Sequence, residues 1–561
     1  MLFSGQIGVK LLLLKGLARG RRGLTEKRQI LRSASIITVA TVISRICGYL
    51  RDQRITLLLG TSFAADCFIL AFRIPNTLRR LVGEGSLSAS FIPVFTGYVR
   101  EGANPEAWRF AERVFWVIAI VAGTITALGA VFSRQVIAAM TIMSGSAANW
   151  DLAVYLNRII LPYILIVSLG ALAAAILNSL HVFGLPAASP ILFNLSMIVF
   201  SLGVVYRPIM RWAPVQYRSP AVALAVGVLV GGSVQLAVLL RAVYVRGMRF
   251  RPQVSFSDPG VRTVGRLMIP GFLGIGVYQI NFFMNTVFAT SRRLPAGSVT
   301  SLYVADRVME LTLGCFAIAV STAILPMLSR QAVAGKIADM RKTFEFALRM
   351  VLFVTIPAAA GLILLREPIV QVLFQHGKFS AQSTALTSRA LLYYSLGLPG
   401  FAGIKLVAPL FYSLKDTATP VRVGVYALVL NIVLNLIFIA RFSASLSNGG
   451  PALATSISAY MNFSVLLGIF RARFGRVGAR SIVRSVGKIA ICSVLMAGGC
   501  LSALRYVHFE ALGPVVWQAG ALAAMIFGSI VVYLGLAWAF RCEELSEAAI
   551  LLRPSEAATA F

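Results

Sequence analysis

Charged side chains are concentrated in an apolar stretch of the sequence that runs from Ser44 to Pro93. The stretch otherwise has the composition of membrane-spanning helices, and an ionisable side chain at the centre of a bilayer costs about 2.5–3.5 kcal/mol. Such side chains usually face the interior of a helix bundle or a water-filled path. The charged residues are Arg45, Arg51, Asp52, Arg54, Asp66, Arg73, Arg79, Arg80 and Glu84. Because arginines outnumber acids, the stretch predicts an interior site for an anion.

The spacing of these residues places several of them on common helix faces. Arg45 and Asp52 are seven residues apart and share a face, with Arg51 about a third of a turn away. A second stripe with the same spacing contains Asp66, Arg73 and Arg80, and Arg79 flanks it. Later in the chain, Asp306 and Glu310 are one turn apart with Arg307 beside them, and Lys405 lies alone in an apolar run.

The chemistry predicted for these arginines is the binding of a phosphate or diphosphate. A guanidinium group donates paired hydrogen bonds to such groups and stays charged when it is desolvated. Asp66 and Asp306 would position the arginines or pair with them between substrate visits. Each group of charges also has a purely structural alternative. The acids and arginines could form internal salt bridges that hold helices together. Arg79 and Arg80 could mark the end of a helix, and Lys405 could extend its amine toward the membrane surface.

The composition is that of an integral membrane protein. The chain is 58% hydrophobic and 13% charged, and its mean hydropathy is +0.82. Spanning helices need about 20 mostly apolar residues, and on that basis we predict an all-α polytopic protein with about fourteen transmembrane helices. The predicted spans are 33–58, 62–82, 110–134, 152–181, 187–206, 219–243, 261–290, 299–328, 343–366, 384–413, 418–441, 450–472, 482–506 and 514–541. The short connections leave no room for a soluble catalytic module, so we expect no enzymatic activity.

The predicted helices divide into two lobes of six and a final pair, an arrangement typical of transporters. The predicted units are a basic extension at 1–32, an N-lobe at 33–243, a C-lobe at 261–472, a helix pair at 482–541 and a tail at 542–561. Proline and glycine residues within the apolar runs, Pro162 and Pro399 among them, are possible bending points.

The net charge of +32 reflects membrane topology rather than binding to nucleic acid. Lysine and arginine collect in cytoplasmic loops, and here they cluster in 1–32, 241–266, 330–349 and 471–488, which lie on one side under a count of fourteen helices. Segment 207–218, with three arginines, is the main exception. We therefore predict a cytoplasmic membrane protein whose extension and tail are both cytoplasmic, in contact with anionic membrane lipids.

No metal site or cofactor is predicted from the cysteines and histidines. The six cysteines are scattered without a CxxC pair, and the three histidines, His181, His376 and His508, lie far apart in the sequence. We interpret the cysteines as small core residues.

Several long segments resemble one known family. They are SRxxGxxRD at 44–52, ADCFILAFRIPNTLRRLVGEGSLSASFIPVF at 65–95, LNSLHVFGLPAASPILFNLSMI at 177–198, YVADRVMEL at 303–311, LFQHGKFS at 373–380 and KLVAPLFYSLKDTATPV at 405–421. In this order they resemble the MurJ/MviN lipid II flippases of the multidrug/oligosaccharidyl-lipid/polysaccharide exporter superfamily. The resemblance implies two six-helix lobes in a V, a C-terminal helix pair that forms a groove for a lipid tail, and export of lipid II by alternating access for cell-wall synthesis.

The resemblance also implies roles for individual residues. The family's cavity arginines fall on Arg45, Arg51, Arg79 and Arg307, its acidic partners on Asp66, Glu84 and Asp306, and its cavity lysine on Lys405. Arg73 stands where a relative has lysine. With the residues singled out by spacing, the predicted substrate-binding set is Arg45, Arg51, Arg73, Arg79, Arg307 and Lys405, and the charge-partner or gating set is Asp52, Asp66, Glu84, Asp306 and Glu310.

Some relatives carry a sodium site built from acidic and amide groups. The matching region here offers amide and hydroxyl groups but no carboxylate: Asn281, Asn285, Asn431, Asn435, Thr455 and Ser456. Asn285, Asn431 and Asn435 are therefore only weak candidates for sodium ligands, and we expect no sodium site. The membrane potential, at about 2.3 kcal/mol per charge per 100 mV, could drive the transition alone.

Four functions compete at this point. The leading one is a monomeric lipid II flippase, with lipid II, membrane lipids and the peptidoglycan-synthesis machinery as expected partners. A polysaccharide-lipid or drug exporter of the same superfamily is an alternative, although a pump for cations would favour acids in its cavity. A membrane glycosyltransferase would need a larger outward loop, and a non-transporting scaffold of the wall-synthesis machinery would have no need of charges within helices.

Overall fold

The computed structural model describes residues 35–81, 86–100, 104–147, 149–475, 478–507 and 509–551. These residues form helices joined by short turns, and they contain no strand. The first described helix covers residues 35–59. The longer helices that follow are α2 (Phe63–Leu81), α3 (Leu87–Arg100), α4 (Asn104–Val131), α5 (Ser133–Met140), α6 (Asp151–Ile160), α7 (Tyr163–Ser179), α8 (Gly184–Phe200), α9 (Gly203–Trp212), α10 (Pro220–Val245), α11 (Pro259–Ala289), α12 (Ser298–Val333), α13 (Ile337–Phe374), α14 (Ala381–Leu396), α15 (Leu398–Ser413), α16 (Ala418–Arg441), α18 (Gly449–Phe474), α19 (Ala479–Tyr506), α20 (Val515–Ala539) and α21 (Glu543–Leu551).

The predicted all-α membrane architecture is confirmed. Among the described residues, eight helices are long and apolar enough to cross a membrane, or ten if each of two bent helix pairs counts as one span. The helices that fall outside this set include residues 35–59 and α2, where charged residues interrupt the apolar sequence. The count of fourteen spans stays a prediction, although every predicted span coincides over most of its length with one or two helices.

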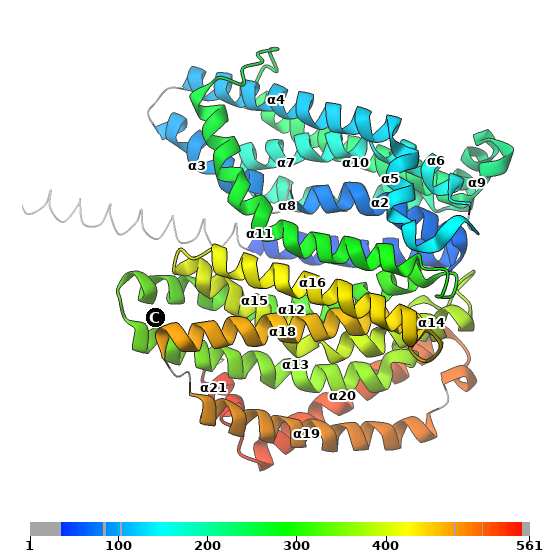
Figure 1. The fold of residues 1–561 in the computed structure, drawn as a ribbon, viewed down its shortest axis with the longest axis vertical. Coiled ribbons are helices and arrows are strands. Elements are labelled where there is room, and N and C mark those ends of the chain that lie inside the picture. The colour runs from blue at the N-terminus through cyan, green and yellow to red at the C-terminus, as the bar shows by residue number, and fades with distance from the viewer. Residues whose placement is uncertain are drawn as a thin grey trace, which may run out of the picture.

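The helices run roughly parallel to one another in two groups (Figure 1). The N-terminal group, from residue 35 to α10, has a hydrophobic cluster of its own around Phe91, Phe110 and Leu172. The C-terminal group comprises α12 to α18, and the pair α19 and α20 packs against its α13. That pair has a separate small cluster of Phe353 from α13 with Ile489 and Tyr533, and the Tyr533 hydroxyl donates to the Phe353 carbonyl at 2.7 Å.

Helix α11 connects the two groups and contacts both. Asp258 caps its first turn by accepting a hydrogen bond from the Val261 amide at 3.1 Å, and Arg113 of α4 forms an ion pair with the same carboxylate. Val264 belongs to the N-terminal hydrophobic cluster. The other end of α11 packs on α16 and α18 of the C-terminal group. The helix that we predict to be the first of the C-lobe therefore also packs on the N-terminal group.

Three predicted spans are interrupted near proline or glycine. The predicted span 384–413 is α14 and α15, bent by 48° at Gly397, with Pro399 in the first turn of α15. The predicted span 187–206 is longer than expected, because α8 continues into α9 with a bend of 74°. Pro162 likewise separates α6 from α7. A proline cannot donate the backbone hydrogen bond that would continue the helix, which explains the breaks at Pro162 and Pro399.

The first described helix is exposed at one end and buried at the other. Val39, Val42 and Ile46 are 50–58% exposed, whereas Ile55 and Leu59 are 5% and 2% exposed. The buried end lies among residues of both helix groups, in one hydrophobic cluster with Leu302 and Phe374. The two helix groups therefore meet closely at this end, which we call the junction.

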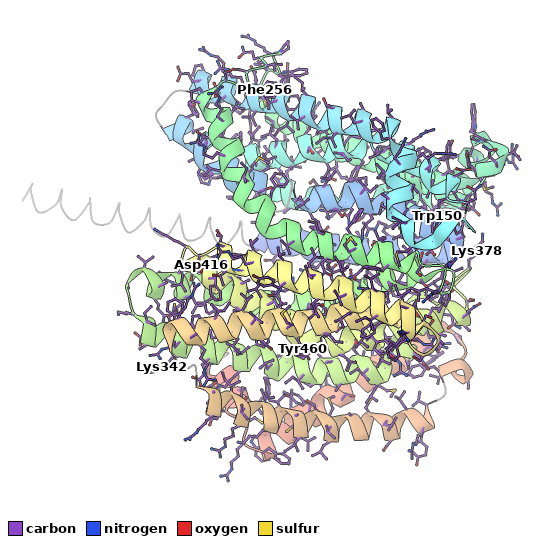
Figure 2. The ribbon with its side chains drawn as sticks, in the orientation of Figure 1. Trp150, Phe256, Lys342, Lys378, Asp416 and Tyr460 are labelled. Carbon is purple, nitrogen blue, oxygen red and sulfur yellow. The ribbon has the colours of Figure 1, made fainter. Side chains whose placement is uncertain are left out.

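The ends of the molecule differ in the segments they carry. Figure 2 shows Trp150 and Lys378 at the end where the junction lies, and Phe256, Lys342 and Asp416 at the opposite end. Phe256 and Lys342 belong to two of the arginine- and lysine-rich segments, 241–266 and 330–349. These two basic segments thus share one end of the molecule, as their sequence positions predict.

Candidate functional site between the two helix groups

Ion pairs form a continuous network of five side chains across the two helix groups. This charged network consists of Arg51, Asp52, Arg307, Glu310 and Arg80. Arg51 Nη2 lies 2.7 Å from Asp52 Oδ1, and Asp52 Oδ2 lies 3.8 Å from Arg307 Nε. Arg307 Nη1 lies 2.7 Å from Glu310 Oε2, and Glu310 Oε1 lies 3.3 Å from Arg80 Nη1. The network links the first helix and α2 to α12.

Neighbouring polar and aromatic groups orient the two central arginines. Arg51 donates to the Asn194 side chain of α8 at 3.0 Å and lies over the Phe193 ring at 6.0 Å. The Arg307 guanidinium lies 5.0 Å from the Tyr303 ring centroid, in the range of a cation–π contact. The Arg51 and Arg307 side chains are 14% and 23% exposed, so both are largely removed from solvent.

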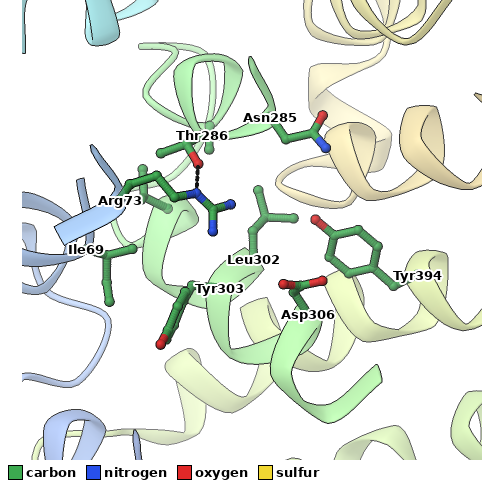
Figure 3. A pocket seen from close by; sticks show the side chains of 10 residues that line it. Ile69, Arg73, Asn285, Thr286, Leu302, Tyr303, Asp306 and Tyr394 are labelled. Atoms are coloured by element: carbon green, nitrogen blue, oxygen red, sulfur yellow. Dashed lines mark hydrogen bonds between the residues drawn. The ribbon is translucent and has the colours of Figure 1, made fainter. Parts of the chain in front are cut away.

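Arg73 and Asp306 line a small polar cavity beside the charged network (Figure 3). Arg73 Nε donates to Thr286 Oγ1 of α11 at 2.9 Å, and its Nη2 donates to the Phe282 carbonyl at 3.2 Å. The cavity volume is about 10 Å³, enough for a single water molecule. Asp306 is 3% exposed, and its Oδ1 atom has no hydrogen-bond partner among the described residues.

The remaining predicted cations lie around the same region. A Cβ atom at Gly314 of α12 would come within 2.9 Å of Arg45 Nη1, so the glycine makes room for this arginine. Arg79 Nε donates to Asn76 Oδ1 at 3.2 Å. Lys405 interacts electrostatically with Glu310, Arg80 and Asp306. Glu84, which the sequence predicts to be an acidic partner, lies outside the described residues.

The site carries more positive than negative charge. Among the described residues, its seven basic side chains are Arg45, Arg51, Arg73, Arg79, Arg80, Arg307 and Lys405, and its three acids are Asp52, Asp306 and Glu310. Seven less three leaves a formal surplus of four positive charges. A bundle interior tolerates such a surplus poorly unless an anion or water compensates it, so the composition of the site fits an anionic ligand with more than one charge.

Among the described residues, Asp66 contacts a helix end rather than an arginine. Asp66 accepts hydrogen bonds from the Gly297 amide at 2.9 Å and from the Thr300 amide and hydroxyl at 2.8 and 2.7 Å. These donors form the first turn of α12, where a carboxylate compensates unpaired backbone amides and the helix dipole. Asp66 thus holds α2 of one group against α12 of the other at the junction.

The junction also brings backbones together at glycines. Gly297 has φ of +86° and Gly377 has φ of +62°, which favours glycine. A Cβ atom at Gly377 would lie 2.5 Å from the Leu57 carbonyl oxygen, a distance that no side chain tolerates. Next to it, the Lys378 amide donates to the Leu57 carbonyl at 2.9 Å, and the Thr61 and Ser383 hydroxyls are 2.8 Å apart. Direct hydrogen bonds therefore close this end.

The predicted weak sodium ligands form a buried amide cluster within α11, α16 and α18. Asn285 Nδ2 donates to Thr455 Oγ1 at 2.8 Å, and Asn431 Nδ2 donates to the same hydroxyl at 3.3 Å. Asn435 Nδ2 lies 3.0 Å from Asn431 Oδ1 and 3.4 Å from Asn285 Oδ1. The amides mostly satisfy one another, and no carboxylate takes part in these hydrogen bonds. The cluster has the properties of a polar contact between helices.

Sequence reasoning missed three partners of the charged residues. Asn194 lies in the apolar run 187–206, where a polar side chain indicates a polar partner on a neighbouring helix. Tyr303, four residues before Arg307, shares the face of that arginine. Thr300 gave no signal, since its contact with Asp66 depends on how α2 meets α12.

Fold and site together define a multi-pass helical membrane protein with a cationic site between two helix groups. Among solved structures, the chain is similar to "Lipid II flippase MurJ, inward closed conformation", with a TM-score of 0.73 and 25% identity, covering 90% of this chain and 98% of that one. It also shares the fold of an inward-facing multidrug resistance MATE family transporter of the MOP superfamily, with a TM-score of 0.62 and 16% identity over 78% of this chain and 98% of that one.

Sequence comparisons establish the family. The family model "Lipid II flippase MurJ" matches residues 55–515. A "Probable lipid II flippase MurJ" of Vibrio cholerae is 36% identical over 91% of this chain and 96% of its own length. A protein of the same description from Bdellovibrio bacteriovorus is 33% identical over 93% of this chain and 97% of its own length. The chain therefore belongs to the MurJ family, and the resemblance inferred from its motifs is confirmed.

Membership settles several broader predictions. The family is one of transport proteins rather than enzymes, so the expectation of no enzymatic activity is confirmed. The protein is a multi-pass protein of the bacterial inner membrane. The roles of the individual charged residues, the orientation of the termini and the energy source are matters for the proposal below.

Proposed function

We propose that the protein moves lipid II, the undecaprenyl-diphosphate-linked peptidoglycan precursor, from the inner to the outer leaflet for cell-wall synthesis. Its relatives are described as lipid II flippases, and the alignment spans nearly their whole length. The observation that carries the proposal is the charged network, because a cationic surplus between the two helix groups suits a ligand that carries a diphosphate.

The arginines of the network would bind the diphosphate by exchanging partners. Without substrate, Arg51 pairs with Asp52 and Arg307 pairs with Glu310. A diphosphate offers pairs of oxygen acceptors that a guanidinium group can bind bidentately, as it binds a carboxylate, so it can replace the carboxylates one hydrogen bond at a time. Because Arg51 belongs to one group and Arg307 to the other, binding would change the contacts that link the groups.

The described conformation would be closed toward the outside and accessible from the cytoplasm. The basic segments 241–266 and 330–349 mark the cytoplasmic end under the positive-inside rule, which places the junction outside and both termini inside. Release to the outer leaflet then requires the contacts of Asp66 with α12 to break. Asp66 would thus act as an outer latch in an alternating-access cycle of an N-lobe (33–243) and a C-lobe (261–472), beside the helix pair 482–541.

The membrane potential would drive the cycle without sodium or any other cofactor. The site carries surplus positive charge, and each charge that moves through the potential gains about 2.3 kcal/mol per 100 mV. The amide cluster lacks the carboxylate that would help to hold Na⁺. We expect the protein to work as a monomer, since both helix groups that form the site belong to one chain.

A drug exporter and a scaffold of the wall-synthesis machinery are the remaining alternatives. Similarity to MATE transporters concerns the fold alone. A cavity for cationic drugs would need surplus acids, whereas this one has surplus arginines, and a scaffold needs no network of buried ion pairs. The charge of the site therefore favours a flippase for an anionic lipid.

Headgroup accessibility in cells tests the proposal. After depletion of the wild-type protein, an externally added enzyme that cleaves lipid II at the outer leaflet should no longer reach its substrate. Wild-type protein should restore cleavage, and Arg45→Ala should not, although it is inserted at normal levels. Undiminished cleavage after depletion, in a cell with no second flippase, would contradict the proposal.

A further inference from the structure

A basic pocket lies away from the charged network, where α19 meets α13 and α21. Its volume is about 200 Å³, and α19 contributes three basic residues to its lining, Arg480, Arg484 and Lys488. These residues repeat every four positions and therefore share one helix face. Ser481 and Ser485 add hydroxyl groups on the neighbouring face.

Two acids, Glu543 and Glu544, also line this pocket together with Arg349, and both are engaged by that arginine. Arg349 of α13 lies 2.6 Å from Glu543 and 2.9 Å from Glu547 of α21, and 3.5 Å from the buried Glu544. Ser485 donates a further hydrogen bond to Glu544 at 2.6 Å. These contacts attach α21 to α13 and α19, and they direct the carboxylates toward Arg349.

The basic residues of α19, by contrast, keep free donor groups. Within the described part of the chain, neither Arg480 nor Arg484 has a carboxylate within ion-pair distance, and both are exposed. Lys488 donates one hydrogen bond, to the Arg541 carbonyl at 3.0 Å. Two arginines and a lysine at the end of a membrane helix can together receive a phosphate group.

An apolar surface continues directly from the basic residues along the same face of α19. Ile491 and Leu495 follow Lys488 at helical spacing and are 51% and 48% exposed. The distance along the axis from Arg484 to Leu495 is about 16 Å, close to half the hydrocarbon thickness of a bilayer. Cationic groups followed by an exposed apolar stripe match the shape of a phospholipid.

We propose that this basic pocket binds the phosphate of an anionic membrane phospholipid, whose acyl chains lie along Ile491 and Leu495. We choose a lipid rather than a soluble phosphate because the basic groups lie at the end of a helix that could cross the membrane, where the exposed apolar stripe would face acyl chains. The bound lipid would fix α19 and α21 against α13, and so keep the C-terminal helix pair in place while the two helix groups move. This site is separate from the proposed substrate site and does not rest on the flippase proposal.

Native mass spectrometry of the purified full-length protein, titrated with phosphatidylglycerol, tests this site. We expect the triple variant Arg480→Gln, Arg484→Gln, Lys488→Gln to lose the tightest bound lipid, with at least tenfold weaker affinity. A control variant with the same loss of charge, Arg241→Gln, Arg251→Gln, Arg266→Gln, should bind it like wild type. Phosphatidylcholine should bind at least tenfold more weakly to wild type.

Two further measurements separate the possible ligands and guard against misfolding. Glycerophosphoglycerol, the headgroup without acyl chains, should not displace the lipid at concentrations at which phosphatidylglycerol saturates the site. The conservative variant Arg480→Lys, Arg484→Lys should keep the affinity within about threefold, because a lysine can still bind a phosphate. Equal affinities of wild type and the glutamine variant, or displacement by the soluble headgroup, would overturn the proposal.

Discussion

The charged network and the amide cluster are both buried polar groups inside a membrane protein, yet they are built in opposite ways. The network joins the two helix groups through ion pairs and contains an excess of arginines. The amide cluster lies within the C-terminal group and α11, and its neutral side chains mostly bond to one another. The first retains binding capacity for an external anion, and the second uses most of its capacity internally, although Asn435 Oδ1 has no hydrogen-bond partner among the described residues.

The degree of pairing distinguishes a binding site from a structural contact. A buried polar group that is fully paired contributes to stability and leaves nothing for a ligand. A site with surplus charge of one sign costs stability unless a ligand of the other sign binds. Loss of the network should therefore abolish transport with little effect on folding, and loss of the amide cluster should do the reverse.

The largest expected effect is that of Arg307→Ala. It removes the residue that pairs with both Asp52 and Glu310, so we expect transport to fall at least 100-fold while the protein still inserts. Growth of a strain with the variant as its sole copy, together with membrane levels of the protein, measures this. Arg134→Ala, which removes an exposed ion pair with Asp151, should grow normally. Normal growth with Arg307→Ala would remove the network from the mechanism.

Asp66→Asn should have the second largest effect. The substitution replaces charged acceptors of three hydrogen bonds from α12 with a neutral amide, at a cost of about 1.5–3 kcal/mol. The junction should then open more often, which we expect to lower transport about tenfold. A cysteine introduced at Ser383 should react faster with a water-soluble reagent added from outside in the Asp66→Asn background. Unchanged labelling would show that Asp66 does not hold the junction closed.

Asn435→Ala tests whether the amide cluster serves stability rather than transport. Loss of the Asn435 hydrogen bonds to Asn431 and Asn285 should destabilise the protein by about 1–2 kcal/mol, measured as a lower Tm in detergent. Transport should persist at a third of wild-type level or more. Replacing sodium with potassium should leave both the Tm and transport of the wild type unchanged. A sodium-dependent Tm that Asn435→Ala abolishes would instead make the cluster an ion site.

The smallest expected effect concerns an ion pair outside the membrane. Asp416 accepts hydrogen bonds from the Thr419 amide and hydroxyl at 2.9 and 2.6 Å, and its carboxylate lies 2.6 Å from Arg473. Burial alone would raise the pKa of Asp416, but these hydrogen bonds outweigh it and hold the pKa below its usual value. The stabilisation is therefore present above the ordinary aspartate pKa and is lost as the pH falls through the lower folded value.

Hydrogen exchange of the backbone amides of Thr417, Ala418, Thr419 and Val421 checks this pair. Asp416→Asn should speed exchange modestly at pH 7, because it removes the charge that pairs with Arg473, and such an exposed pair contributes about 0.2–1 kcal/mol. The difference between wild type and variant should shrink as the pH falls through the lowered pKa of Asp416, because the wild-type carboxylate is then itself protonated. A difference that is independent of pH would show that the charge of Asp416 does not matter. Transport should be unaffected, which sets this charged pair apart from the network.

Much of the fold and part of the site could be predicted from the sequence. Apolar runs located the helices because a bilayer requires long apolar segments. The seven-residue repeats correctly grouped Arg73 and Arg80 on a face of α2 that meets α11 and α12. The interpretation of Arg80 as a residue at a helix end agrees with its position in the last turn of α2, and from there it also pairs with Glu310.

Contacts between distant helices could not be predicted. Asp66 shares the stripe of Arg73 and Arg80 but lies two turns nearer the junction, where it meets the first turn of α12 instead of an arginine. Periodicity fixes the face of a side chain, but the tilt between helices decides what it meets. The bend at Gly397 could be inferred from Pro399, whereas its size of 48° depends on packing.

Binding of a polyprenyl diphosphate to the purified protein tests the central claim most directly. The dissociation constant would be measured for wild type, for Arg51→Gln with Arg307→Gln, and for Asn435→Ala. The account predicts at least tenfold weaker binding by the double arginine variant and unchanged binding by Asn435→Ala. Equal affinity of the arginine variant and the wild type would contradict the claim that the charged network holds the diphosphate.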